Sequence, residues 1–453
     1  MLKISSNKYI LDTSREYSIY VCEQRAIPQI TDGLKSSQRK MLWVIRNKKE
    51  KIKTISLAGE AISEGLYLHG DQSASQAISM LAAPYANNVP LLTGIGSFGS
   101  LTDPYSIGAP RYTYVKKNIF TEKILYADLD LVPLVENYDG SNLEPKHFLP
   151  LVPLVLLNGV SGIAVGWATE ILPRNLNDLI DAVVAVLESK DFETPEPKYD
   201  YLDIVTKKID TNVWEFYGKI EKNDNSSIVV KSLPPETTLE KFKEKLDSLE
   251  EEGKIQEYVD NSSEKIDILV KFKRGTLSDY NEEKILDLLK LRTRKTERIV
   301  VIDFDGNSVK QYDSAKDLII DWVSWRIKFY YSRYEKLIAE LEDEIEYLIS
   351  LKKCFEENFL ENIKICKNKK EVLNLIQNIV GNISEKNIEK ISQLPTYKWN
   401  NEYYKEVLNE IEEKCNKILE YQEILNDHSK IKNIYKSELE ETRKYFEKYK
   451  VEK

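Results

Sequence analysis

The feature that most constrains this chain is a heptad spacing of apolar side chains beyond about residue 312. These residues recur at alternating intervals of four and three, which places them along one stripe of a helix and is typical of a coiled-coil seam. Two such seams predict two long helices that form an antiparallel arm over residues 312–453, with a small helical tip at about 352–403. An ordinary helix bundle is the alternative that periodicity leaves open. The first seam consists of Ile327, Tyr331, Tyr334, Ile338, Leu341, Ile345 and Leu348, and the second of Tyr404, Leu408, Ile411, Cys415 and Ile418.

Residues 122–311 are predicted to form a separate mixed α/β domain. Turn clusters at NYDG, PKYD, EKNDNSS and RGTLSDY separate runs of strand formers such as NVWEFYGKIEK and SSIVVKSLP. Near its end, Asp303 and Asp305 resemble the aspartate pair of a phosphotransferase. A hairpin is the stronger interpretation, because Asp305-Gly306 lies between two runs of strand formers, as in a tight β-turn.

Residues 1–121 have the pattern of a winged-helix DNA-binding domain. SLAGEAISEGL and QSASQAISMLAAPY suggest two short helices joined by YLHGD, a connection of helix-turn-helix type. PLLTGIGSFGS then predicts a glycine-rich hairpin, and RYTYVKKNIF a strand that carries Tyr112 beside the wing. A basic helical stretch precedes them around Lys35 and Arg39, and by itself it is better explained by a solvated basic face.

Charge is distributed unevenly along the chain. The formal net charge is −9, which on its own disfavours a polyanionic partner. Residues 1–120, however, carry 15 Lys and Arg against 9 Asp and Glu. Any nucleic-acid surface is therefore expected mainly in the N-terminal part.

Several other classes of protein are disfavoured. Four scattered cysteines indicate neither a disulfide framework nor a metal cluster, and they fit a reducing, intracellular setting. Three histidines make a multi-histidine metal site within one chain unfavourable, so no metal site is predicted. The N-terminus lacks the apolar core of a signal peptide. The uncharged run FLPLVPLVLLNGVSGIAVGWAT has the length of a membrane span, but its prolines and glycines favour a buried strand, turn and strand, so no membrane partner is expected.

Six segments together resemble one family, the breakage-reunion part shared by gyrase A subunits, topoisomerase IV and eukaryotic topoisomerase II. The segments are RAIPQITDGLKSSQRKML, YLHGDQS, GIGSFGS, PRYTYV, NYDG and NGVSGIAVGWAT, in the family's order over residues 20–170. The rest of the chain matches the family's architecture, with a tower domain and a coiled-coil arm, more than its motifs. A chain without a wrapping or ATPase domain is similar to the separate medium-sized cleavage subunits of T-even-like phage topoisomerases, with a cellular homologue as the alternative.

The resemblance implies that Tyr112 attacks a DNA phosphodiester and forms a transient 5′-phosphotyrosyl link. Such a link conserves the energy of the broken bond, so the strand is resealed without ATP in that step. A free tyrosine has a pKa of about 10, and Arg111 beside it favours the phenolate and the developing phosphate charge. Taken alone, a strand tyrosine beside an arginine is more often a packing residue, and its place among the ordered motifs reverses that preference.

Two more residues are implied at the reaction centre. Arg25, in RAIP, matches an arginine that the family places near the scissile phosphate, where a guanidinium holds two oxygens. His69, in YLHGD, matches a histidine close to the active centre, although Leu68 stands where many relatives have another residue. The sequence leaves open whether His69 relays protons or hydrogen-bonds phosphate.

The resemblance also implies a set of DNA contacts. Lys35, Arg39 and Lys40 would contact the DNA backbone, and Ser73 and Gln76 would lie on the helix that faces DNA. Ile163, in GVSGIAVG, matches the residue that wedges between base pairs and bends the duplex. Core packing is the alternative for Ile163 if the resemblance fails.

The implied assembly extends beyond this chain. The family draws its Mg²⁺ ligands from a partner subunit that also hydrolyses ATP, so the chain is expected to be inactive alone. It is expected to dimerise through the coiled-coil tip, since a double-strand break requires two tyrosines, and to work in the cytoplasm of a bacterial or phage-infected cell. Two alternatives remain: a winged-helix DNA-binding dimer without cleavage, and a hydrolase using Asp303 and Asp305 that would keep its activity without Tyr112.

Overall fold

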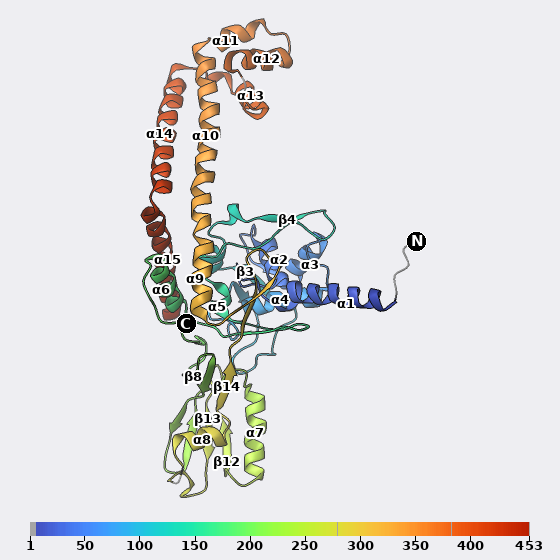
Figure 1. Cartoon of the computed structure of the whole chain (residues 1–453), viewed down its shortest axis with the longest axis vertical. Helices are drawn as coiled ribbons and strands as arrows, with labels where there is room; N and C mark the ends of the chain where they lie inside the picture. The colour runs from blue at the N-terminus through green and yellow to red at the C-terminus, as the bar shows by residue number, and fades with distance from the viewer. Residues whose placement is uncertain (1–5, 279, 382, 453) are drawn as a thin grey trace. The chain divides into compact units, whose positions relative to one another are not determined.

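The computed structural model describes residues 6–278, 280–381 and 383–452, which form a mixed α and β fold. The chain divides into two compact units. Unit 1 holds the described residues up to Arg326 together with those from Lys436 onward, and unit 2 holds Ile327–Tyr435 (Figure 1). Within the described residues, every helix is too short or too polar to cross a membrane.

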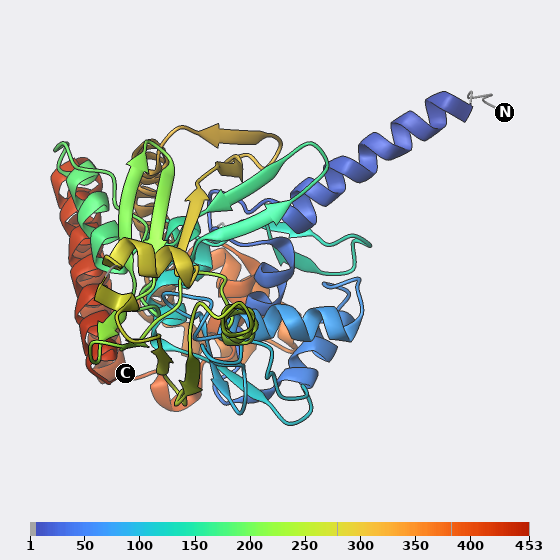
Figure 2. The ribbon, with the colours of Figure 1, turned by 90° about the horizontal axis from the view of Figure 1, so that it is seen from below.

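The N-terminal part of unit 1 combines helices with a small antiparallel sheet. Its elements are α1 (Ser6–Val21), the π-helical turn η1 (Cys22–Ala26), α2 (Ser36–Ile45), β1 (Ile52–Lys53), α3 (Thr54–Ser63), α4 (Asp71–Ala82), β2 (Leu92–Ile95) and β3 (Tyr114–Lys117). α3 and α4 contact each other and α2, and β3 lies between β1 and β2 in the sheet. Both expected helices are therefore present, and the expected strand begins at Tyr114. The glycine-rich stretch contributes the one strand β2, which pairs with β3 and not within a hairpin of its own as expected. Figure 2 shows α1 projecting from the rest of these elements.

The next part of unit 1 is built from two hairpins and short helices. They are η2 (Thr121–Leu125), η3 (Leu129–Leu131), β4 (Leu134–Glu136), β5 (Leu143–Pro145), α5 (Leu154–Asn158), β6 (Val160–Ile163), β7 (Ala168–Ile171) and α6 (Leu176–Leu187). β4 pairs with β5 and β6 with β7. The uncharged run was expected to be strand, turn and strand, and this is wrong for its first half. Residues between Pro153 and Gly159 form the single helical turn α5, which Pro153 begins and Gly159, with φ of +66°, ends.

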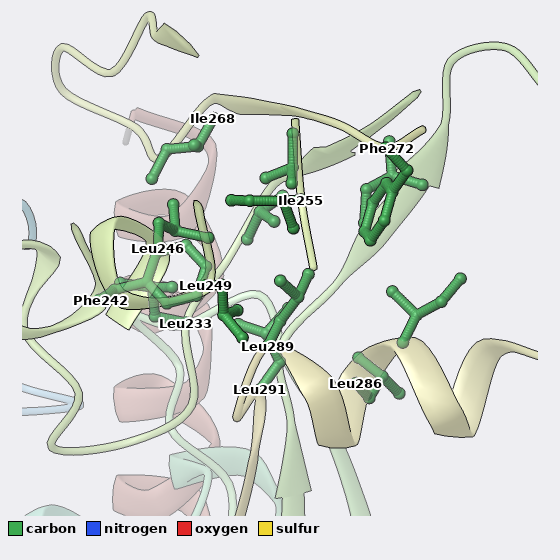
Figure 3. Close-up of a cluster of buried hydrophobic side chains, with 14 of the residues drawn as sticks. Leu233, Phe242, Leu246, Leu249, Ile255, Ile268, Phe272, Leu286, Leu289 and Leu291 are labelled. Atoms are coloured by element: carbon green, nitrogen blue, oxygen red, sulfur yellow. The ribbon is translucent and has the colours of Figure 1, made fainter. Parts of the chain in front are cut away.

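Residues 205–296 form two sheets with a core of their own. The elements are β8 (Val205–Asp210), β9 (Val213–Tyr217), β10 (Ile220–Lys222), β11 (Ser227–Val230), α7 (Leu239–Glu251), β12 (Glu257–Asp260), β13 (Ile268–Lys271), η4 (Thr276–Ser278), α8 (Glu282–Leu288) and β14 (Arg292–Thr296). One sheet has the order β14-β9-β8 and the other β10-β11-β13-β12. Phe242 and Leu246 of α7 pack with Ile268 of β13 and with Leu289 and Leu291, as Figure 3 shows.

The last elements of unit 1 include the expected hairpin. β15 (Ile299–Ile302) pairs with β16 (Val309–Tyr312), and α9 (Ala315–Arg326) follows. The connection is longer than a tight two-residue turn, because Ile302 pairs with Val309. Asp303 accepts hydrogen bonds from the backbone N–H groups of Gly306 at 2.8 Å and Asn307 at 3.0 Å and so stabilises the loop.

Unit 2 consists of two long helices and a small helical cluster. Its elements are α10 (Lys328–Glu356), α11 (Phe359–Asn362), η5 (Ile363–Ile365), α12 (Lys369–Val380), α13 (Glu385–Ser392), η6 (Thr396–Lys398) and α14 (Asn401–Asn426), and α15 (His428–Glu452) leads back into unit 1. The side chains of Asn368, Ser384 and Asn400 cap the starts of α12, α13 and α14. α12 and α13 pack around Ile376 and Ile391 in a common core with the ends of α10 and α14.

α10 and α14 run antiparallel along each other. Tyr404 bonds Glu356, and Lys414 pairs with Glu344 at 2.6 Å, so increasing numbers on one helix meet decreasing numbers on the other. The residues of the first expected seam are half-buried, and Leu348 at its end is buried. The second is displaced at two positions, because Leu408 and Cys415 are exposed while Val407 and Lys414 turn inward.

Candidate functional site

Tyr112 was expected on a strand, but it lies in a turn just before β3. Its backbone N–H donates to Ala109 O at 2.8 Å, which closes the turn. The N-terminal end of α3 holds this turn in place, since Thr54 N donates to Thr113 O at 3.0 Å and Ile55 N to Pro110 O at 3.2 Å. Because helix N-terminal N–H groups lack intrahelical partners, these bonds satisfy them and fix the turn together.

The Tyr112 side chain is accessible. It is 69% exposed, and the Arg111 guanidinium carbon lies 4.9 Å from the centroid of its ring. The neighbouring Thr113 is buried, and its hydroxyl lies 2.9 Å from that of Thr54. A buried threonine thus anchors the backbone, while a phenol with an adjacent cation is presented to solvent.

A second group of residues joins η1 to the loop between α3 and α4. Arg25 Nη2 donates to His69 Nε2 at 3.3 Å, and the Tyr20 hydroxyl lies 3.3 Å from the same nitrogen. The Tyr67 ring meets the His69 ring edge-on with 5.3 Å between centroids. Arg25 is exposed and His69 is half-buried, so both are open to a ligand. Single π-helical turns such as η1 are frequent at functional sites.

The β6–β7 hairpin presents an apolar tip beside η1. Ile163 is 85% exposed and Val165 is 62% exposed, which excludes core packing for Ile163. The hairpin approaches η1 so closely that a Cβ on Gly162 would lie 2.0 Å from Ala26 O. Ala26 follows Arg25 directly, so the close approach of Gly162 to Ala26 O places the hairpin tip next to Arg25 in the backbone.

The three basic residues expected on DNA differ in environment. Lys35 Nζ donates to Ser161 O at 2.9 Å, and burial lowers the pKa of the Lys35 ammonium. Arg39 is buried, and its guanidinium binds Asp32 twice, at 2.7 and 2.8 Å. The structure therefore differs from the prediction that Arg39 contacts the DNA backbone, because its donors are already bound within the fold.

Lys40 and α4 complete the set of expected DNA contacts. Lys40 pairs with Glu144 at 3.0 Å, and both side chains are largely buried, so Lys40 is also bound within the fold. Ser73 and Gln76 are exposed on α4, and the Ser73 hydroxyl lies 2.9 Å from that of Tyr67. Lys35, Ser73 and Gln76 line one cavity of about 870 Å³.

The structure thus brings the expected residues together in two groups. Arg111 accompanies Tyr112, whereas Arg25, His69 and the Ile163 hairpin meet at η1. Within the described part of the chain, no hydrogen bond or ring contact joins Tyr112 to Arg25 or His69. Sequence reasoning missed Tyr20, Asp32 and Gly162. Asp32 stands in the Asp-Gly turn before α2, and its spacing of seven from Arg39 was a signal for a pair, but Tyr20 had none.

Mg²⁺ requires clustered oxygen ligands. Among the residues that the structure describes, no group of three or more His, Cys, Asp or Glu side chains could hold a metal ion. Asp128 is committed to a buried ion pair with Arg326.

Known proteins resemble the chain over most of its length. The family model for the A subunits of DNA gyrase and topoisomerase IV matches residues 25–440. The DNA topoisomerase medium subunit of Enterobacteria phage T4 is 34% identical over 348 residues, which are 74% of this chain and 77% of that protein. The DNA topoisomerase 2 of Saccharomyces cerevisiae is 29% identical over 71% of this chain, which spans only 23% of that protein.

A solved structure matches the fold as well. The Plasmodium falciparum topoisomerase II DNA-binding, cleavage and re-ligation domain has a TM-score of 0.84 and 25% sequence identity. The match covers 98% of this chain and 65% of that one. With a family model that spans most of the sequence and a relative above 30% identity, the chain belongs to the family of DNA gyrase and topoisomerase IV A subunits.

Proposed function

We propose that this chain is the DNA breakage-reunion subunit of an ATP-dependent type II DNA topoisomerase and that Tyr112 is its nucleophile. The observation that carries the proposal is the exposed Tyr112 phenol beside Arg111, in a chain that belongs to this family. Among 27 tyrosines, Tyr112 combines high exposure, an adjacent cation and a braced backbone.

The proposed step is a transesterification. The Tyr112 oxygen forms a bond to the DNA phosphorus, the bond from phosphorus to the 3′ oxygen breaks, and the phenolic proton leaves to solvent or a base. The departing 3′ oxygen takes a proton from solvent or an acid. The product is therefore a 5′-phosphotyrosyl link and a free 3′ hydroxyl, and the reverse attack reseals the strand. Arg111 would stabilise the phenolate and the developing charge.

Arg25 and His69 form the second half of the proposed site. An exposed guanidinium is suited to two phosphate oxygens at once, and without DNA it donates to His69 Nε2 at 3.3 Å. Ile163 would enter the base stack as a wedge, which is supported by its exposure at the hairpin tip. Because Tyr112 and the Arg25 group occupy separate places in one chain, we propose that two protomers or a movement of DNA bring them to one phosphate.

The remaining proposed DNA contacts are Lys35, Ser73 and Gln76, while Arg39 and Lys40 are omitted. Their common cavity supports a shared surface for the duplex. We further propose a winged-helix domain at 1–121, a tower domain at 122–311 and a coiled-coil arm at 312–453 with its tip at about 352–403. The contacts among α2, α3, α4 and the sheet around β3 support the first of these.

The proposed holoenzyme contains two copies of this chain and a partner subunit, and it acts on double-stranded DNA. The family's Mg²⁺ and ATP would both be bound by the partner, as the family resemblance implies. The second copy would meet this one through the tip, where Ile365 is 79% exposed. Similarity to a phage protein supports the cytoplasm of an infected or bacterial cell as its location.

The two rival functions are less well supported. A DNA-binding dimer without cleavage would not require the exposed Tyr112 and Arg111 pair, and family membership favours cleavage. A hydrolase acting through Asp303 and Asp305 conflicts with the role of Asp303, whose carboxylate holds the hairpin loop.

Detergent-trapped cleavage tests the proposal. The chain is mixed with its ATPase and metal-binding partner, Mg²⁺ and supercoiled plasmid, and protein-linked linear DNA is measured for the wild type, Tyr112→Phe and Tyr138→Phe. Tyr138 is a matched control because it is 88% exposed but lies in the turn between β4 and β5. Loss of cleavage in Tyr112→Phe alone, with DNA binding retained, is expected; cleavage that survives in Tyr112→Phe would overturn the assignment.

A further inference from the structure

His69 Nε2 is approached by two donors at once. Arg25 Nη2 and the Tyr20 hydroxyl both lie 3.3 Å from this nitrogen, longer than an ordinary hydrogen bond of about 2.9 Å. A guanidinium has no acceptor, so Nε2 must accept, and the neutral ring carries its proton on Nδ1. An imidazole nitrogen has one lone pair in the ring plane, which cannot serve two donors at full strength.

The surroundings hold the three groups in place. The Arg25 guanidinium carbon lies 5.6 Å from the centroid of the Tyr20 ring, so the tyrosine contacts both members of the pair. Tyr67 fixes the His69 ring from its other side, and its own hydroxyl is engaged with Ser73. Tyr20 is 39% exposed near the end of α1, which leaves its hydroxyl room to shorten one bond.

We propose that Tyr20 is a positioning residue that releases Arg25 to the DNA phosphate by taking over His69. When Arg25 turns to the phosphate oxygens, its bond to His69 is lost, and the Tyr20 hydroxyl becomes the sole donor to Nε2. The exchange keeps Nε2 hydrogen-bonded and the ring in one tautomer, so that Arg25 leaves at little cost. This inference rests on the proposed role of Arg25 in cleavage.

The exchange predicts a defined kinetic effect of Tyr20→Phe. The variant keeps the ring under Arg25 but removes the donor, so Arg25 is withheld from the phosphate by its bond to His69. Loss of the net free energy of one hydrogen bond is expected to lower the cleavage rate at saturating DNA by about two- to tenfold. The affinity for DNA is expected to stay unchanged within about twofold. Tyr17→Phe is the matched control, because Tyr17 lies on the same helix and stacks on Tyr20 with 6.4 Å between centroids.

A double-mutant cycle separates positioning from simple structural support. If Tyr20 acts through His69, the Tyr20→Phe effect disappears in a His69→Ala background, whereas a structural effect of the tyrosine persists there. Full additivity of the two substitutions would overturn the proposal.

Ring nitrogen spectroscopy gives a readout that is independent of activity. With ¹⁵N-labelled histidine, the full chain has three imidazole rings, each with two ring nitrogens to assign, and His147 and His428 serve as internal references. On addition of an uncleaved DNA duplex, the shift of His69 Nε2 is expected to change in the wild type, because its donor changes from the Arg25 guanidinium to the Tyr20 hydroxyl. In Tyr20→Phe the shift is expected to stay as it is without DNA, because Arg25 remains bound. The same change on DNA addition in both proteins would contradict the exchange.

The outcomes also separate this proposal from the proposed function. If Tyr112→Phe still cleaves, the function itself fails. If Tyr112→Phe abolishes cleavage but Tyr20→Phe behaves like Tyr17→Phe in rate and spectrum, only the role of Tyr20 is rejected.

Discussion

Arg25 and Arg39 stand in the same basic segment, yet their environments are opposite. Arg25 is exposed on a π-helical turn, whereas Arg39 is buried and bound to Asp32. Both are cations near glycine or proline in the sequence, so residue type could not separate them. Spacing was informative only for Arg39, because α2 begins at Ser36 and turns residue 39 inward over the Asp32-Gly33 turn. The sequence offered both arginines as candidates but could not distinguish the exposed one from the buried one.

Asp32 is expected to be a major determinant of stability. Its carboxylate is fully buried and accepts from Arg39, from Leu34 N at 3.1 Å and from Phe148 N at 3.0 Å. Asp32→Ala leaves the Arg39 charge buried without its carboxylate, which typically costs about 3–5 kcal/mol. A large fall in the urea midpoint of the full chain is therefore expected.

The control for this prediction is Asp203→Asn. Its carboxylate pairs with Lys219 but is 75% exposed, and exposed pairs contribute about 0–1 kcal/mol. Equal urea midpoints for the Asp32 and Asp203 variants would show that the buried pair does not support the fold.

At the scale of elements, the positions of turns could be predicted from the sequence, but the residue at which a strand begins to pair could not. The helices of residues 54–82 and the hairpin at β15 and β16 follow from glycine, asparagine and aspartate signals in the sequence. The place of Tyr112 depends on where β3 begins to pair, and the bonds from α3 to Pro110 O and Thr113 O decide this. Those contacts join segments far apart in the sequence, so alternation of residue types along RYTYVKKNIF could not reveal them.

The contact between the β6–β7 hairpin and η1 is expected to require glycine at position 162. A Cβ there would lie 2.0 Å from Ala26 O, so Gly162→Ala must push the hairpin away from η1. Overpacking of this kind costs about 1–3 kcal/mol, and we expect DNA cleavage to fall by at least about tenfold because Ile163 and Arg25 lose their common backbone contact. Urea unfolding and the plasmid cleavage assay measure the two effects.

Gly59→Ala is the matched substitution. An added Cβ at Gly59 meets nothing within 4 Å, and alanine is favoured in the helix α3. Unchanged cleavage by Gly162→Ala, or an equal loss in Gly59→Ala, would show that the close approach at η1 has no special role.

At the scale of the molecule, the antiparallel pair of long helices was predictable because a heptad pattern persists over many turns. The side chains that each helix turns toward the other were less predictable. Val407 and Lys414 turn inward where Leu408 and Cys415 were expected, since a Lys stem can cover apolar surface while its ammonium reaches Glu344. Apolar periodicity alone therefore misassigned two of the five positions of the second seam.

Dimerisation through the tip predicts a local sensitivity. Ile365 is 79% exposed within the helical cluster of unit 2, and a charge there would be buried in the proposed contact between two copies. Ile365→Asp is expected to shift the chain toward monomer in light scattering at micromolar concentration. Leu419→Asp, at a 59% exposed position on α14, is expected to leave the dimer intact. Equal dimers from both variants would place the contact elsewhere.

The most direct test of the central claim is to identify the amino acid that carries DNA. Cleavage by the holoenzyme is trapped with detergent, the DNA is digested with nuclease, and the protein is cut with trypsin. The peptide expected to carry the nucleotide spans residues 112–116 and holds two tyrosines, so fragment spectra must place the phosphate. We expect a 5′-linked nucleotide on Tyr112, whereas linkage to Tyr114 or to any other residue would contradict the assignment of Tyr112 as the nucleophile.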